Sequence, residues 1–215
     1  MALSTYSELK TAIAGWLRRT NLTDQIPDFI TLCEAQFNRR LRLSPMVERA
    51  DAVLDTEYGA LPGQMISPVR FIMQTDPLTE LRLVSAERLA AMKAAQTLGT
   101  STKPEYWAIV GEQYQLYPAP GTAYTGQMTY WKKVPALSDA SPTNWLLTEA
   151  PDLYLYGSLM QSAPYLRSDE RIETWASFYR TAVGDLQRRY RVSNPTTLRS
   201  DELVLTHHFD ITRGI

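Results

Sequence analysis

The feature that most constrains the fold is a change of periodicity along the chain. Apolar residues recur at helical spacing before residue 46 and again after residue 143. Between these two regions, short apolar stretches alternate with Gly and Pro, which is typical of strands joined by turns. The helices at the two ends are therefore expected to pack together around one core, with the strand-rich middle inserted between them.

The two ends predict four long helices. Thr5 and Glu8 have the spacing of a capping box, in which each side chain hydrogen-bonds a free amide at the helix start. The expected buried stripe of this first helix is Leu9, Ile13, Trp16 and Leu17. The third helix has almost no polar face and is expected at the centre of the bundle. The predicted helices span residues 5–19, 23–43, 148–165 and 169–191.

The middle of the chain predicts an antiparallel sheet with a short helix ahead of it. Residues 106–117 have the pattern of a hairpin, with two aromatic-rich strands around Gly111. Residues 124–134 have the pattern of a third strand beside that hairpin. Residues 85–96 are expected to form the short helix, with Ser85 as its N-cap.

The predicted fold class is therefore α+β, a helical bundle of four long helices with a β-rich insertion (an antiparallel sheet plus a short helix) and an extended C-terminal arm. Four regions are expected. They are the N-terminal helices of the bundle (1–45), the β-rich insertion (46–143), the C-terminal helices of the bundle (144–192) and the arm (193–215).

Composition argues against several classes of function. The net charge of -1 over 215 residues does not suggest a nucleic-acid-binding protein. The one cysteine, Cys33, excludes a disulfide framework, and its place on an apolar helix face predicts a buried side chain. No apolar run approaches the roughly 20 residues of a membrane span, so no membrane association is expected. The N-terminus lacks the basic and apolar regions of a signal peptide.

The sequence holds no motif with catalytic or metal-binding spacing. His207 and His208 are adjacent, so in an extended chain their side chains point to opposite faces and do not share one metal ion. We therefore expect no enzyme activity, no catalytic, cofactor-binding or metal-binding residues, and no cofactor. A hydrolase whose residues are scattered along the chain is a weaker alternative.

Two arginine clusters stand at predicted helix C-termini, where they complement the helix dipole and pair with nearby acids. The functional interpretation is contact with phosphate or with acidic groups of a partner. Two tyrosines of the third predicted helix are further candidates for contacts between proteins. The candidate inter-subunit or channel contacts are Arg39, Arg40, Arg42, Arg188, Arg189, Arg191, Tyr154 and Tyr156.

The C-terminal tail alternates with a period of two residues, which is typical of an extended chain. One interpretation is a strand that packs on its own domain. The other, given equal weight, is an arm donated to the surface of another protein. The arm residues that share one face are Leu203, Leu205, His207, Phe209 and Ile211.

Three stretches together resemble the head-to-tail adaptor (connector) proteins of tailed bacteriophages and prophages. They are DFITLCEAQFNRRLR (28–42), PEYWAIVGEQYQLYPAP (104–120) and the block that begins VPALSDASPTNWLLTEAPDLYLYG and ends TWASFY (134–179). The resemblance spans nearly the whole chain to about residue 190. It includes no catalytic signature.

The resemblance implies a structural virion protein that joins head to tail. Such adaptors form an oligomeric ring, usually of twelve copies, beneath the portal protein, where they extend the DNA channel and provide the platform for a tail or nozzle protein. DNA would pass through the lumen without sequence-specific contact, and the C-terminal arm would dock on the portal. The protein would lie at the virion neck after synthesis in the host bacterial cytoplasm. The alternative is a nucleic-acid-binding packaging or regulatory protein that uses the arginine clusters.

Overall fold

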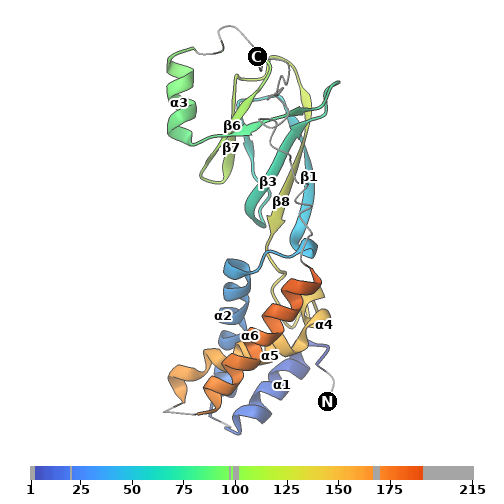
Figure 1. Cartoon of the computed structure of the whole chain (residues 1–215), viewed down its shortest axis with the longest axis vertical. Coiled ribbons are helices and arrows are strands. Elements are labelled where there is room, and N and C mark those ends of the chain that lie inside the picture. The colour runs from blue at the N-terminus through green and yellow to red at the C-terminus, as the bar shows by residue number, and fades with distance from the viewer. Residues whose placement is uncertain (1–2, 20, 97, 99–101, 167–169, 191–215) are drawn as a thin grey trace, which may run out of the picture.

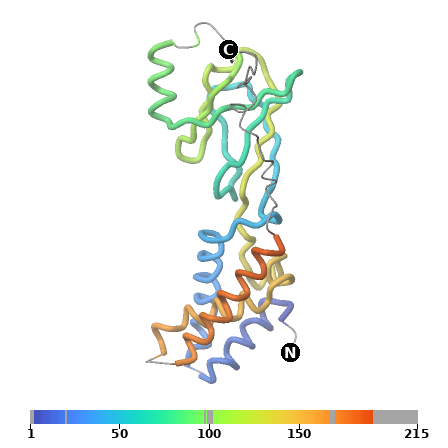
Figure 2. Tube along the Cα trace, in the orientation of Figure 1, coloured from blue at the N-terminus to red at the C-terminus, as the bar shows by residue number. Residues whose placement is uncertain are grey.

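The computed structural model describes residues 3–19, 21–96, 98, 102–166 and 170–190. These residues form an elongated molecule with helices at one end and strands at the other (Figure 1). We call the two ends the helical part (α1, α2, α4, α5 and α6) and the β part (the eight strands and α3). The backbone trace leaves the helical part after α2 and returns to it before α4 (Figure 2).

The helical part is built around α5. Its helices are α1 (Tyr6–Leu17), α2 (Ile26–Arg40), α4 (Trp145–Glu149), α5 (Pro151–Gln161) and α6 (Arg171–Arg189), with 3₁₀ turns η1 (Thr23–Gln25), η2 (Ser44–Met46) and η3 (Ala163–Tyr165). Helix α5 packs against α1, α2 and α6, and apolar side chains from all four helices form one core. Cys33 is fully buried in this core, as predicted.

Helix α2 approaches α5 closely at Gly157. A Cβ atom at this position would lie 2.4 Å from Cys33 Sγ and 3.2 Å from Tyr179 Cε2. Only glycine leaves room for α2 and α6 to contact the same point of α5. Burial raises the pKa of Tyr179 to about 12, so its phenol is neutral inside this contact.

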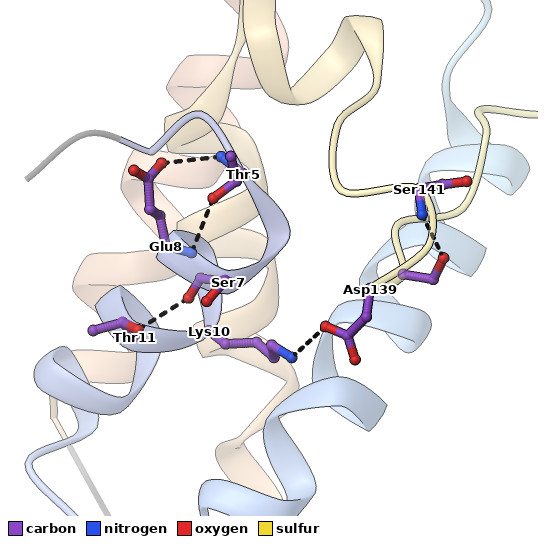
Figure 3. A network of polar contacts seen from close by, with 8 residues as sticks. Thr5, Ser7, Glu8, Lys10, Thr11, Asp139 and Ser141 are labelled. Atoms are coloured by element: carbon purple, nitrogen blue, oxygen red, sulfur yellow. Dashed lines mark hydrogen bonds and ion pairs between the residues drawn. The ribbon is translucent and has the colours of Figure 1, made fainter.

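The start of α1 confirms the predicted capping box. Thr5 Oγ1 accepts a hydrogen bond from Glu8 N at 3.3 Å, and Glu8 Oε2 accepts one from Thr5 N at 3.1 Å (Figure 3). One turn further on, Lys10 Nζ lies 2.9 Å from Asp139 Oδ1. This ion pair connects α1 to the segment that returns from the β part.

The predicted bundle of four long helices is wrong. The described residues contain six α-helices, of which α6 has 19 residues and the other five have 5 to 15. The predicted helix 148–165 is instead α4, α5 and η3 in succession. The break falls at Ala150, which has φ -142° and ψ 68°, because Pro151 disfavours helical backbone in the residue before it.

The β part consists of two four-stranded sheets in the described residues, with strand orders β1-β8-β3-β4 and β2-β7-β6-β5. Phe71 of one sheet makes edge-to-face contacts with Trp107 and Tyr114 of the other at ring distances of 5.3 and 5.4 Å. The sheets therefore share a core between them. The strands are β1 (Val47–Leu54), β2 (Tyr58–Ala60), β3 (Met65–Met73), β4 (Thr79–Glu80), β5 (Arg82–Leu83), β6 (Tyr106–Val110), β7 (Gln113–Tyr117) and β8 (Tyr124–Lys132).

The prediction of one antiparallel sheet is also wrong. The hairpin of β6 and β7 around Gly111 is confirmed, but β8 does not lie beside it. Strand β8 is in the other sheet, where it pairs with β1 from Val47–Trp131 to Leu54–Tyr124. Moreover, β5 and β6 are parallel. The short helix α3 (Ala86–Ala94) begins at the predicted N-cap, Ser85.

Candidate functional site

A groove of about 740 Å³ lies where the helical part meets the β part. The C-terminal ends of α2 and α6 contribute its basic residues, and β1, β3 and β8 contribute apolar side chains. Its lining residues are Arg40, Arg42, Leu43, Val47, Val69, Trp131, Gly184, Gln187, Arg188 and Tyr190. We call this the basic groove.

The basic groove brings together the two arginine clusters of the sequence. Arg40 is the last residue of α2, and Arg42 lies two positions beyond it. Arg188 lies in the last turn of α6. They meet because both helices run toward the β part and end at the same level (Figure 1). The contact between Tyr190 and Trp145, at a ring distance of 6.3 Å, fixes the end of α6 against α4.

The arginines of the two clusters differ in how their charge is balanced. Arg188 pairs with Asp185, and Arg189 Nη1 lies 3.1 Å from Glu149 Oε2. Arg42 Nη1 instead donates to the backbone oxygens of Asn38 and Leu41, at 3.0 and 2.6 Å. Neither Arg40 nor Arg42 pairs with a carboxylate among the residues that the structure describes. Within the described residues, the positive charge at the end of α2 is therefore not balanced by a paired carboxylate.

Among the remaining candidates of these clusters, Arg39 is exposed on α2 and does not line the groove. Arg191 lies outside the described residues. The arm residues Leu203, Leu205, His207, Phe209 and Ile211 also lie outside them, as do His207's neighbour His208 and the whole predicted arm 193–215.

Tyr154 lies in the core of the helical part, with 0% of its surface exposed. Its phenol donates to Glu34 Oε1 at 3.2 Å and accepts from Asn144 Nδ2 at 2.6 Å. Burial and the nearby Glu34 carboxylate raise the pKa of Tyr154, and burial raises the pKa of Glu34. These groups hold the fold together, and Tyr154 has no surface to offer to a neighbouring subunit.

Tyr156, by contrast, is half-buried in a cluster on the surface. Its ring lies 5.8 Å from that of Trp16 on α1 and 5.2 Å from that of Phe178 on α6. Trp16 is 44% exposed and Phe178 46% exposed. We call these three residues the aromatic patch. Large aromatic groups exposed together are typical of surfaces that contact other proteins.

The described part of the chain contains no group of three or more His, Cys, Asp or Glu side chains that could hold a metal ion. Burial raises the pKa of Cys33 well above its ordinary value, so its thiol is not a nucleophile. None of the described helices is both long and apolar enough to cross a membrane. The groove and the aromatic patch have the features of binding surfaces.

Sequence reasoning named Tyr156 as a candidate contact but missed the rest of the aromatic patch and the apolar side of the groove. Trp16 was expected in the buried stripe of the first helix, and Phe178 was not singled out. The exposed Val69 and the half-buried Trp131 lie on strands whose pairing was not predicted. The helical spacing correctly placed Trp16 on the apolar face of α1. How much of that face is buried depends on the packing of α5 and α6, which the spacing does not reveal.

In comparison with known families, the family model described as SU10 adaptor protein matches residues 4–199. The match includes the helical part, the β part, the basic groove and the aromatic patch. No curated protein matches the chain significantly.

Proposed function

Since the chain belongs to the SU10 adaptor protein family, a family of phage head-to-tail adaptors, we propose that it forms a ring beneath the portal and extends the DNA channel there. Adaptors of this family are structural proteins of the virion neck that associate with portal and tail proteins. They are typically not enzymes. The observation that carries the proposal is the family match over residues 4–199, which leaves only 3 residues before it and 16 after it.

In this proposal, about twelve copies surround a lumen through which DNA passes without sequence-specific contact. The helices of 1–45 and 144–192 form one unit, and the insertion 46–143 forms another that reaches toward the tail or nozzle protein or toward neighbouring subunits. The arm 193–215 docks on the portal through Leu203, Leu205, His207, Phe209 and Ile211. The elongated molecule with two structurally different ends supports a role between two different partners (Figure 1).

The test is co-assembly with the portal protein of the same phage, imaged by electron microscopy. The full-length chain is compared with a truncation after Ser193. We expect rings of the full-length chain on the portal and none of the truncated chain. If neither protein binds, the adaptor function is contradicted. If both form rings on the portal, the ring stands and the docking role of the arm is contradicted.

The basic groove favours a second candidate function, which is sequence-independent DNA binding. Arg40, Arg42 and Arg188 converge there, and arginines bind phosphate. If all three contact phosphates, the logarithm of the binding constant should fall with the logarithm of salt concentration at a slope of about -2.7. Fluorescence anisotropy with a labelled duplex over a salt series measures this slope. The variant Arg40→Ala/Arg42→Ala/Arg188→Ala should abolish this salt dependence. Portal docking through an apolar arm should depend little on salt.

A further inference from the structure

Besides Tyr165 of η3, the helical part exposes large apolar side chains at two separate sites. One is the aromatic patch of Trp16, Tyr156 and Phe178. The other is Leu32, which is 49% exposed on the outer face of α2. Asp28 lies one turn before Leu32 on the same exposed stripe of α2, and Arg39 lies two turns after Leu32 on that stripe. Isolated apolar residues need no explanation, but a patch and a protruding side chain in one layer suggest a contact.

These two sites lie on opposite sides of α5. Tyr154 and Gly157 face α2, since Tyr154 contacts Phe37 at a ring distance of 5.0 Å and Gly157 contacts Cys33. Tyr156 follows Tyr154 by two residues, which places it on the far side of the helix, between α1 and α6. A contact that joins the two sites therefore joins two different molecules.

The two sites also lie at the same level along the helices. Cys33 and Tyr179 both approach Gly157, so they mark one level of α2 and α6. Leu32 precedes Cys33 by one residue, and Phe178 precedes Tyr179 by one residue. If the ring axis runs along these helices, rotation from one copy to the next leaves the height of each residue along the axis unchanged. Leu32 of one copy then meets Phe178 and Tyr156 of the next.

The charges around the two sites are opposite in sign and follow the same order along the helices. Counting from Phe178, Arg171 lies two turns before it and Asp185 two turns after it on α6. Arg171 is held beside the aromatic patch, since its Nη1 donates to Trp16 O at 3.1 Å. Alignment of Leu32 with Phe178 therefore places Arg39 at the level of Asp185 of the next copy, which also pairs with its own Arg188. It places Asp28 within about one turn of the level of Arg171.

We propose that neighbouring copies of this chain pack through a heterologous contact in which Leu32 of α2 inserts into the aromatic patch of the next copy. The contact rests on the proposed ring and assigns its two complementary surfaces. It uses different faces on opposite sides of one subunit, so it propagates from copy to copy, as a ring contact must. Leu32 gains aromatic neighbours at the centre of the contact, and the charged pairs border it, which is the usual arrangement of a protein interface.

The first test compares exposed apolar residues that are inside and outside the proposed contact. Leu32→Asp and Phe178→Ser are each assembled with the portal of the same phage, with Val53→Asp as the matched control, because Val53 is 64% exposed on β1. We expect each of the first two variants to lower the yield of rings at least about tenfold and the control to leave it unchanged. Thermal unfolding of each isolated variant should stay within about 2 °C of the wild type.

The second test reverses a charged pair. Asp28→Arg and Arg171→Asp should each reduce ring yield, and the double variant should restore it. Restoration by the double variant would support a contact between Asp28 of one copy and Arg171 of the next. This comparison remains informative even if Leu32→Asp fails to fold.

The outcomes separate the contact from the proposed function. If the wild type forms no ring on the portal, the adaptor function and the contact are both contradicted. If the wild type and Leu32→Asp form rings equally well, the contact is wrong and the function stands. If Phe178→Ser forms rings but binds portal or tail protein poorly, the aromatic patch belongs to that partner and the proposed contact is also wrong.

Discussion

The phenol of Tyr154 on α5 donates a hydrogen bond to the carboxylate of Glu34 on α2 across 3.2 Å, in the buried interior of the helical part. The same oxygen of Glu34 accepts a hydrogen bond from Leu137 N at 2.8 Å. One turn along α2, Asn38 Oδ1 accepts from Val134 N, also at 2.8 Å. Polar groups of α2 therefore fix the segment that returns from the β part, and with it the attachment of that part to the helices.

Removal of the Glu34 carboxylate should destabilise the protein. Glu34→Ala leaves two buried donors without an acceptor, at a cost of about 1–3 kcal/mol for each. Glu34→Gln keeps an oxygen at the end of a side chain of the same length, so its unfolding free energy should stay within about 1 kcal/mol of the wild type. Urea unfolding followed by circular dichroism measures both. Equal losses for the two variants would contradict the assigned role of the acceptor oxygen.

Glu34 should also give the stability a specific pH dependence. Burial raises the pKa of Glu34 above its ordinary value of 4.5, so the folded protein binds this proton more tightly than the unfolded chain. The stabilisation is complete below pH 4.5 and is lost as the pH rises through the raised pKa. Urea midpoints of the wild type minus those of Glu34→Gln should therefore decrease from pH 4 upward. A constant or increasing difference would show that the carboxyl group does not titrate in this way.

Sequence reasoning succeeded where the structure depends on neighbours in the chain. The capping box of Thr5 and Glu8, the N-cap Ser85 and the hairpin turn at Gly111 are all encoded within a few residues, and all are confirmed. The break at Ala150 also had a local signal. Pro151 was interpreted as a first-turn residue of one long helix, although it is the first residue of α5 after a separate helix α4.

The pairing of distant segments was not predictable in this way. The contact of Val47 with Trp131 joins strands that are 84 positions apart, and alternation alone does not identify a partner strand. The same limit applies to the basic groove. Both arginine clusters were recognised at helix C-termini, but their convergence on one groove depends on the relative packing of α2 and α6.

The shared core of the two sheets should be sensitive to Phe71. Phe71→Ala removes a ring that is 1% exposed and contacts Trp107 and Tyr114, so the β part should lose about 3–5 kcal/mol. Val53→Ala is the control, because Val53 is exposed, and should change stability by less than about 0.5 kcal/mol. Urea unfolding followed by circular dichroism measures the loss of stability in both variants. Similar losses for both variants would contradict a sandwich core centred on Phe71.

The contact at Gly157 predicts a coupled pair of substitutions. Gly157→Ala places a Cβ atom 2.4 Å from Cys33 Sγ, so α2 and α5 have to separate at a cost of about 1–3 kcal/mol. In a Cys33→Ala background the sulfur is absent, and the same substitution should cost at least about 1 kcal/mol less. Gly15→Ala is the matched control, since no atom lies within 4 Å of the added Cβ, and it should stabilise α1 by about 0.5–1 kcal/mol. A double-mutant cycle from urea unfolding measures the coupling. Strictly additive effects of Gly157→Ala and Cys33→Ala would mean that the two helices do not meet at this point.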